Sequence, residues 1–456
     1  MTENKNKFGL TNAQHEAFEG ITGDLEVVQD GDIFGENSWI SLRGPAGTGK
    51  TYLSLSIVQT LLDKNMTIAV LAPTHQAVKV IKNTIDIEHK NIVYSTLHAF
   101  LGLKPGDIDP KTGEKKFKKV TGKNASPLSK LKVDVVILDE SSMVGDELFN
   151  FLKKEMYENN RIKSFLFIGD SCQLMPVETD SALDNYKHPV YNNDMINHYN
   201  LKELIRNDDP EVINFVTVIR KMIESGASKF EMFNFLVNEA EKQDEYNKIH
   251  FFRNKKEFMT KYLEDDRVQS TEGCIATFTN ENVQKYNNLF RDYFIKKKYT
   301  DISEVPDLHR DDLLVVQSGN EDFINSEILT LRMFVKKEYD FKGKKFQGYF
   351  CTTTDGRSFN RIAKESEADY EYALSLLKEN AIKQKNRAAW LMYYELIELF
   401  LDVRFHYAYT CHKLQGSSYN EIYVDMTGLG YVQDSMILRL MYVAITRSRG
   451  HIYILL

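Results

Sequence analysis

The chain has 456 residues, 42% of them hydrophobic, and a formal net charge of −7 at pH 7. This length allows two or three domains, and the hydrophobic content excludes a disordered chain. The negative charge argues against a protein that coats nucleic acid through a general basic field. A polar N-terminus without any apolar stretch long enough for a bilayer predicts a soluble, cytoplasmic protein with no membrane partner. The scattered cysteines predict reduced thiols and indicate neither disulfides nor a zinc site.

A glycine-rich loop follows the first predicted strand. Residues 39–42 are apolar and predict a strand, and residues 44–51 read Gly-Pro-Ala-Gly-Thr-Gly-Lys-Thr. Glycines let successive N–H groups point at phosphate oxygens, and a helix that begins at Lys50 adds the positive end of its dipole. The pattern predicts a nucleoside triphosphate site in which Lys50 contacts the β- and γ-phosphates and Thr51 holds Mg²⁺. The buried face of the helix is predicted at Leu53, Ile57, Val58, Leu61 and Leu62.

Lysines crowd the segment 101–131, which carries the turn signal Asp-Pro-Lys-Thr-Gly at residues 109–113 between short strand-like pieces. A cluster of this kind is usually a solvated surface, and a local track for nucleic acid is the alternative. The lysines of the cluster lie at positions 111, 115, 116, 118, 119, 123, 130 and 132.

Two carboxylates follow the next predicted strand. Residues 133–140 form an apolar run that ends in Asp139 and Glu140. A buried parallel strand delivers such side chains to the carboxyl edge of a sheet, where ligands of open α/β folds bind. Caps of following helices look similar. After a phosphate loop, however, the pair predicts that Asp139 holds Mg²⁺ through water and that Glu140 orients and deprotonates the attacking water.

A further apolar strand, residues 165–168, runs into Gly-Asp-Ser-Cys-Gln-Leu-Met-Pro and places Gln173 just beyond a strand end. A neutral amide there suits a sensor of the γ-phosphate, and an ordinary loop amide is the alternative. Arg206 and Arg447 each end an apolar segment. An arginine on the equatorial oxygens of the transition state contributes on the order of 10³–10⁵ to the rate of phosphoryl transfer. Surface ion pairing is the plainer explanation for both arginines.

The C-terminal part predicts a second α/β domain without a phosphate loop of its own. Strands are predicted at 274–279, 406–410, 421–425 and 451–456, with a helix over 434–447. Residues 311–401 lie between these elements and predict strands at 313–316, 328–335 and 349–354, followed by helices. In these helical segments Leu391, Tyr394, Ile397 and Leu401 fall at helical spacing. The nucleotide is therefore predicted to bind between two domains.

Taken in order, the motifs resemble those of the superfamily-1 helicases. They begin with Gln14 and the phosphate loop and continue with APTHQA (72–77), STLHAF (95–100), LDES (138–141), GDSCQLMPV (169–177), LKELIR (201–206), ATFTNENV (276–283), YTCHKLQGSS (409–418) and MYVAITRSR (441–449). The series is most similar to the RecD-like, B-type branch, with a particular likeness to DNA helicases of T-even bacteriophages. It spans residues 14–449, nearly the whole chain, in family order.

The resemblance implies an α/β fold with two RecA-like P-loop NTPase domains on parallel sheets. Residues 1–185 would form the first domain, with an inserted β-hairpin at 101–131 in which Pro105 and Phe117 separate strands. Residues 186–310 and 402–456 would form the second domain. Residues 311–401 would be an inserted SH3-like β-barrel with a helical extension, in which Trp390 would be either core or a contact to the hairpin.

The resemblance also implies a role for each matching residue. Gln14 would read the adenine edge, and Gln173 would couple the γ-phosphate to motion. Arg206 and Arg447 would be the arginine fingers. The nucleotide-binding residues would be Gln14, Gly44, Pro45, Ala46, Gly47, Thr48, Gly49, Lys50, Thr51, Gln415 and Gly416. The DNA-binding residues, which would contact phosphates without reading bases, would be Pro73, Thr74, His75, Thr96, His98, Thr410, His412 and Lys413. A core or capping position is the alternative for any single histidine.

The sequence therefore predicts an ATP-dependent DNA helicase that uses ATP and Mg²⁺ in replication, recombination or repair, in the host cytoplasm if phage-encoded. Its 5′→3′ direction is implied by the resemblance alone. The partners would be single-stranded DNA, forked or tailed duplex DNA, and single-strand-binding and replisome proteins. One alternative is an RNA helicase of the same superfamily, because no feature would recognise a 2′-OH. The other alternative is a clamp, a protein that binds a nucleic-acid strand when ATP is bound but does not move along it. Glu140 and the two arginines disfavour this alternative.

Overall fold

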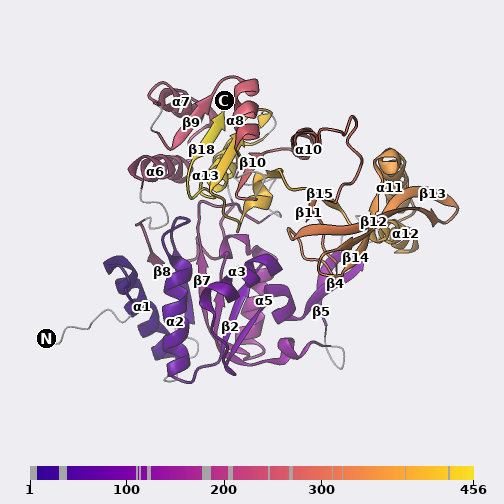
Figure 1. The fold of residues 1–456 in the computed structure, drawn as a ribbon. Helices are drawn as coiled ribbons and strands as arrows, with labels where there is room; N and C mark the ends of the chain where they lie inside the picture. The colour runs from indigo at the N-terminus through magenta and orange to yellow at the C-terminus, as the bar shows by residue number, and fades with distance from the viewer. Residues whose placement is uncertain are drawn as a thin grey trace. The chain divides into compact units, whose positions relative to one another are not determined.

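The computed structural model describes residues 8–29, 38–108, 111, 115–120, 125–176, 186–203, 209–244, 247–265, 271–310, 312–320, 322–385, 387–429 and 432–456. The chain divides into two units (Figure 1). The first comprises Met1–Gly102, Thr121–Thr279 and Tyr409–Leu456, and the second comprises Leu103–Val120 and Asn280–Ala408. In the described part of the chain, no helix has both the length and the apolar character needed to cross a membrane.

The first unit contains a parallel sheet that carries the phosphate loop. Within the described residues its six strands lie in the order β3-β2-β6-β7-β1-β8, and every neighbouring pair is parallel. The strands are β1 (Trp39–Arg43), β2 (Ile68–Ala72), β3 (Ile92–Thr96), β6 (Val133–Leu138), β7 (Ile162–Gly169) and β8 (Asn197–Asn200). The helices are α1 (Asn12–Gln29), α2 (Lys50–Asp63), α3 (His75–Ile85), α4 (Leu97–Leu101), α5 (Asp146–Tyr157) and the 3₁₀ turns η3 (Pro127–Lys130) and η4 (Ser141–Met143). The three strands predicted here are confirmed as β1, β6 and β7.

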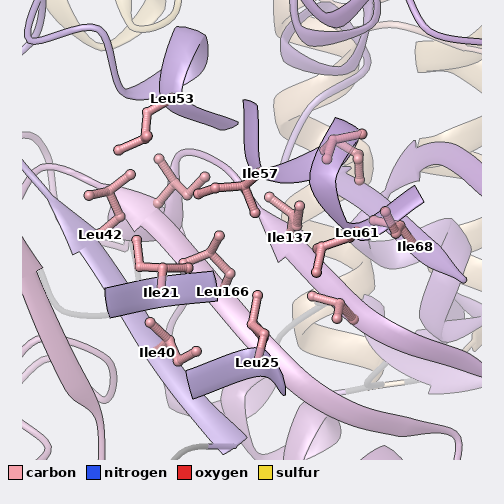
Figure 2. Packing of buried hydrophobic residues seen from close by; sticks show 14 of the residues in the cluster. Ile21, Leu25, Ile40, Leu42, Leu53, Ile57, Leu61, Ile68, Ile137 and Leu166 are labelled. Atoms are coloured by element: carbon pink, nitrogen blue, oxygen red, sulfur yellow. The ribbon is translucent and has the colours of Figure 1, made fainter. Parts of the chain in front are cut away.

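Helices α1 and α2 bury their apolar faces against this sheet (Figure 2). Ile21 of α1 and Ile57 of α2 are fully buried in the same cluster as Leu42 of β1 and Leu166 of β7. The predicted face of α2 is confirmed, because all five of its apolar residues are buried. Burial of one such side chain stabilises the fold by roughly 1.5–3 kcal/mol. This face therefore holds α2, and with it the loop at its start, on the sheet.

A second sheet lies in the same unit. Its strands, counted over the described residues, are five and follow the order β16-β10-β17-β18-β9. The pairs β10–β17, β17–β18 and β18–β9 are parallel. The strands are β9 (Ile249–Phe252), β10 (Gly273–Thr277), β16 (Ala408–Thr410), β17 (Glu421–Asp425) and β18 (Ile452–Leu455), and the helices are α6 (Pro210–Ser225), α7 (Lys229–Ala240), α8 (Lys255–Glu264), α13 (Asp434–Ile445) and the turn η7 (Cys411–Leu414). The four predicted strands and the predicted helix are confirmed, whereas β9 was not predicted.

The second unit combines a hairpin with an antiparallel sheet. The hairpin pairs β4 (Leu103–Ile108) with β5 (Lys115–Lys119) and sets Pro105 opposite Phe117. Among the described residues, five strands form the sheet in the order β14-β13-β12-β11-β15. The strands are β11 (Leu313–Val316), β12 (Ile328–Phe341), β13 (Lys344–Thr353), β14 (Ser358–Ile362) and β15 (Val403–Phe405), and the helices are α10 (Asn280–Lys298), α11 (Lys364–Gln384) and α12 (Arg387–Leu399).

The predicted domain boundaries differ from the structure at three places. β8 pairs with β1, so the first sheet extends beyond the predicted end at residue 185. β15 pairs with β11, so the inserted sheet extends beyond residue 401. α10 belongs to the second unit, which therefore resumes at Asn280 and not at residue 311. Strands as short as β8 and β15 are defined by their partner strands, which a local pattern does not reveal.

The buried residues of α12 differ from the row that falls at helical spacing. Leu391 is 45% exposed, and the helix ends before Leu401. The buried residues of α12 are Trp390 and Leu396. Trp390 is a core residue that packs with Ala381 of α11. The neighbouring helix thus selects a face different from the one that aliphatic spacing alone predicts.

Candidate active site and nucleic-acid contacts

The phosphate loop forms the turn between β1 and α2. Gly47 and Gly49 have φ angles of 89° and 74°, which side chains disfavour, so glycines permit this turn. Thr48 closes the loop from within, because its hydroxyl donates to the carbonyl of Pro45 at 3.0 Å. Lys50 Nζ donates to two carbonyls of the loop at 2.7 and 2.8 Å. Burial lowers the pKa of Lys50, and nearby carboxylates oppose that shift.

A cavity of about 350 Å³ lies against this loop. Four segments form its wall: the phosphate loop with the start of α2, the residues after β6, the end of β7 with the loop that follows, and Arg447 after α13. The lining residues are Ala46, Gly47, Gly49, Lys50, Thr51, Asp139, Glu140, Gly169, Gln173 and Arg447. Its volume lies within the range of small-molecule sites, about 300–1,000 Å³. The structure thus brings Lys50, Glu140, Gln173 and Arg447 to one cavity, and it adds Gly169, which the sequence reasoning missed.

The two carboxylates after β6 differ in their surroundings. The carboxylate of Asp139 accepts the backbone N–H of Glu140 at 2.8 Å. Burial, followed by the negative charge of Glu140, raises the pKa of Asp139 to about 7. A divalent cation would favour the ionised carboxylate, so Thr51 and Asp139 are suited to hold Mg²⁺. Glu140 has a φ of 51°, a left-handed conformation that non-glycine residues adopt at a cost and that clusters at functional sites.

Arg447 supplies a fixed positive charge to the cavity wall. Its side chain is 3% exposed. Its Nε donates to Val443 O at 3.1 Å, and its two terminal nitrogens donate to Ser417 O at 3.3 Å and Thr446 Oγ1 at 3.2 Å. Burial lowers the pKa of Arg447, but a guanidinium stays charged in proteins because its ordinary pKa lies far above neutral pH. The three hydrogen bonds therefore hold a permanent cation in one orientation.

Gln173 is held by two side chains from the segments that connect strands of the second sheet. Gln415, which follows η7, donates its side-chain amide to Gln173 Oε1 at 3.3 Å. Arg439 of α13 donates to the backbone carbonyls of Ser171 and Gln173 at 2.6 and 2.8 Å. A displacement of the loop after β7 would therefore be transmitted to α13 through these bonds.

A buried carboxylate makes a second link between the same segments. Asp170, at the end of β7, accepts a hydrogen bond from Arg220 of α6 and one from the hydroxyl of Tyr442 of α13, each at 2.7 Å. The sequence reasoning missed Asp170, Arg220, Arg439 and Tyr442. Asp170 lies in the motif at 169–177 and Tyr442 in the motif at 441–449. Their polar side chains within apolar segments could have indicated a buried contact. Arg220 carries no local signal.

Several predicted nucleotide-binding residues do not line the cavity. Gln14 is buried, and its amide donates to Thr48 O at 3.1 Å while its Oε1 accepts the N–H of Thr11 at 3.0 Å. The structure therefore ties α1 to the phosphate loop through Gln14. The other predicted residues outside the cavity wall are Gly44, Pro45, Thr48, Gln415 and Gly416. Arg206 lies outside the described residues.

The predicted DNA-binding residues of the first sheet follow β2 and β3, which are neighbours, and β2 ends opposite Thr96. Pro73 is partly exposed, and Thr74 and His75 are exposed. The hydroxyl of Thr74 also caps α3 by accepting the Ala77 N–H at 3.2 Å.

The second pair of these residues is less accessible. Thr96 is 6% exposed and caps α4 through the Ala99 N–H at 3.3 Å, which favours its capping role. His98 is half-buried, and burial lowers its pKa. On the second sheet, Thr410 ends β16 and is partly exposed, as is Lys413, while His412 is exposed.

The strand-separation residues lie in the hairpin of the second unit. Phe117 is 37% exposed. Lys104, Lys111 and Lys118 are exposed as well, so the hairpin presents basic side chains besides an accessible ring. Most of the predicted turn at 109–113 lies outside the described residues, as does Lys123.

Comparisons with known proteins agree with this arrangement. Residues 32–237 match the family described as AAA domain, and residues 405–455 match the family described as UvrD-like helicase C-terminal domain. The chain is 25% identical over 472 residues to the protein named ATP-dependent DNA helicase dda of Enterobacteria phage T4, across 91% of this chain and 93% of that protein. The chain is a relative of the superfamily-1B helicases.

Other relatives of this helicase chain extend the comparison. An uncharacterised protein of Acanthamoeba polyphaga mimivirus is 25% identical over 468 residues, across 84% of this chain and 88% of that protein. The Pif1 helicase from Bacteroides in complex with ADP-AlF3 and ssDNA has a TM-score of 0.52 at 15% identity, with 97% of this chain and 92% of that chain covered. Bacteroides Pif1 bound to ssDNA has a TM-score of 0.52 at 16% identity, with 98% and 92% covered. The predicted α/β fold with RecA-like domains on parallel sheets is confirmed by these likenesses and by the two sheets.

Proposed function

We propose that the chain is an ATP-dependent DNA helicase that moves along single-stranded DNA and separates duplex strands. The observation that carries this proposal is the cavity in which Lys50, Glu140 and Arg447 meet. A nucleotide there would contact the phosphate loop and the segment after α13 together. Its binding and hydrolysis could therefore close and reopen the space between the two sheets. The printed name of the T4 relative, an ATP-dependent DNA helicase, supports the same activity.

The donor set of the cavity suits MgATP. Lys50 would neutralise the β- and γ-phosphates, and Thr51 and Asp139 would hold the metal ion, which lowers the negative charge that the attacking water meets. Glu140 would accept the proton of that water. Arg447 would stabilise the charge that develops on the equatorial oxygens, from an orientation that its three hydrogen bonds already fix.

Three further residues complete the proposed cycle. Gln173 would sense the γ-phosphate and pass its loss to α13 through Arg439. Arg206 would be a second arginine finger, on the strength of the motif alone. Gln14 would read adenine from its place beside Thr48 of the phosphate loop.

Single-stranded DNA and forked or tailed duplex DNA are the proposed substrates. Thr74, His75, His412 and Lys413 offer partly or fully exposed donors beyond the ends of strands, which suits contact with phosphates and no reading of bases. Single-strand-binding and replisome proteins are the proposed partners, and the proposed direction of movement is 5′→3′.

Unwinding of tailed duplexes tests this proposal. We expect ATP-dependent displacement of a labelled strand from a duplex with a 5′ single-stranded DNA tail and little displacement with a 3′ tail. A clamp without travel would bind both duplexes and displace neither. Competition between single-stranded DNA and RNA in the ATPase assay decides between a DNA and an RNA helicase. If RNA stimulated ATP hydrolysis as much as DNA or more, the proposal that DNA is the substrate would be contradicted.

The hairpin gives a separate prediction about strand separation. Phe117→Ala should strongly reduce duplex unwinding while DNA-stimulated ATP hydrolysis and movement on single strands stay near the wild-type rate. Stacking of an aromatic side chain on a base is worth about 1–3 kcal/mol, comparable to the stacking energy of one base-pair step, about 1.4 kcal/mol on average. None of the described hairpin residues lines the cavity, so we expect no direct dependence of hydrolysis on the ring. Unwinding, translocation, ATPase rate and melting temperature are measured together.

Phe230→Ala is the matched control, because Phe230 of α7 is 71% exposed. This control removes the same atoms from a surface without an assigned DNA contact, and it should leave unwinding unchanged. If Phe117 only packs against its neighbours, its replacement lowers the melting temperature and all activities together, and that parallel loss would reject the wedge.

A further inference from the structure

A short turn before β8 contacts three segments of the proposed ATP site at once. This turn, residues 188–191, closes on itself when the backbone N–H of Asn192 donates to His188 O at 3.0 Å. The rings of His188 and Tyr191 stack with centroids 4.4 Å apart. No motif of the sequence includes these residues, and none of them lines the cavity.

The hydroxyl of Tyr191 holds the residue that follows Glu140. Ser141 Oγ donates its hydrogen to Ile168 O of β7 at 2.9 Å, and it lies 3.1 Å from Tyr191 Oη. A serine hydroxyl has a single hydrogen. Because that hydrogen is used on β7, the Tyr191 hydroxyl must be the donor in the second bond. Ser141 is therefore fixed from two sides.

His188 holds the next residue in a defined tautomer. Its Nδ1 accepts the N–H groups of Val190 and Tyr191 at 3.2 and 3.4 Å. Its Nε2 must therefore carry the proton, which it donates to Ser142 O at 3.1 Å. Burial lowers the pKa of His188 to about 4, so the ring is neutral near pH 7 and this geometry persists there.

The same turn reaches the other two segments of the site. Arg43, the residue directly before the phosphate loop, donates to Tyr191 O at 2.8 Å, and its guanidinium carbon lies 5.3 Å from the centre of the Tyr191 ring. A Cβ atom built on Gly169 would lie 2.1 Å from Tyr191 Oη. Gly169, a residue of the cavity wall, therefore leaves room for the Tyr191 hydroxyl directly behind it.

We infer that Tyr191 is a positioning residue for ATP hydrolysis, whose hydroxyl holds Ser141 and so keeps Glu140 in its left-handed conformation at the cavity. This inference rests on the proposed role of Glu140 in hydrolysis. A non-glycine residue keeps a φ of 51° only when contacts with its surroundings hold the backbone in that conformation. The 3₁₀ turn that begins at Ser141 and the two bonds to its hydroxyl supply that constraint.

Replacement of Tyr191 by Phe tests the inference. Phe keeps the ring, its stacking on His188 and its contact with Arg43, and it removes only the donor to Ser141. Since a small misplacement of a reacting group can lower a rate up to about 10²-fold, we expect kcat for ATP with DNA present to fall about ten-fold. The KM for ATP and the melting temperature should change little. Ser141→Ala removes the same bond from the other side, and the double variant should be no slower than the slower single variant.

Tyr199→Phe is the control from the same part of the chain. Its hydroxyl, on β8, donates to Asp24 of α1 at 2.8 Å, away from the cavity, so kcat should not fall. Unchanged kcat in Tyr191→Phe, or rate losses that add in the double variant, would overturn the inference. A fall in melting temperature with kcat and KM altered together would assign Tyr191 a structural role only. Strand displacement by the wild type is measured beside hydrolysis. If the wild type hydrolyses ATP without displacing strands, the helicase proposal is contradicted. The inference about Tyr191 is then still tested by the kcat of the Tyr191→Phe variant.

Discussion

Glu140→Gln should reduce DNA-stimulated ATP turnover by roughly 10²–10⁴-fold, the usual contribution of a general base. Glutamine keeps the size of the side chain but cannot accept a proton from water at neutral pH. Asp139, Thr51 and Lys50 are untouched in this variant, and each also lines the cavity. Binding of MgATP should therefore persist. The variant should behave as a protein that closes on ATP and does not reopen.

Phosphate release in the presence of single-stranded DNA measures turnover, and a fluorescent nucleotide measures binding. Glu158→Gln is the matched control, because Glu158 is an exposed residue at the end of α5 and lies outside the cavity wall. The control should match the wild type in both assays. Hydrolysis by Glu140→Gln at the wild-type rate would show that another group is the base.

The parts of the site that the sequence predicted are those whose signal is local. A glycine-rich loop between an apolar strand and a helix defines its own backbone, and the structure has that backbone at Gly47 and Gly49. The run 133–140 is similar, because a strand that is apolar except for Asp134 is buried whichever partners it finds, and its end lies at the carboxyl edge of the sheet. Asp139 and Glu140 follow from that reasoning and line the cavity.

The parts that could not be predicted depend on partners far away in the chain. Tyr191 and Ser141 are 50 residues apart, as are Arg220 and Asp170, while Tyr442 is 272 residues from Asp170. Nothing near Tyr191 or Arg220 marks the buried group that each contacts. The strand β8 was not predicted for the same reason, because it has no apolar pattern and exists through its pairing with β1.

The buried face of α12 differs from its row of regularly spaced residues for another physical reason. Aliphatic spacing selects one face of an isolated helix, but the face that is buried in a protein is decided by the neighbour with the most apolar surface to cover. In α12 the buried residue is Trp390, which packs with Ala381 of α11, while the adjacent Leu391 is exposed. The buried face of α12 is therefore offset by about one residue from the row of aliphatic residues.

Arg447→Lys should lower kcat by on the order of 10³-fold or more, within the range known for arginine fingers, with the affinity for nucleotide little changed. Lysine keeps the positive charge but lacks the planar fork. It cannot make the three hydrogen bonds by which Arg447 is held to Val443, Ser417 and Thr446. The ammonium would therefore lose its fixed orientation toward the cavity, and the transition state would lose more stabilisation than the bound substrate.

Arg449→Lys provides the comparison within the same motif. Arg449 is exposed and does not line the cavity, so its replacement should leave kcat for ATP hydrolysis unchanged. Because Arg447 is almost fully buried, the melting temperature of each variant is measured as well, at saturating and at zero ATP. A variant that folds normally, keeps its kcat and only binds ATP more weakly would remove Arg447 from the transition state. It would make Arg447 a simple phosphate ligand, and the coupling of hydrolysis to α13 would then rest on Gln173 and Arg439 alone.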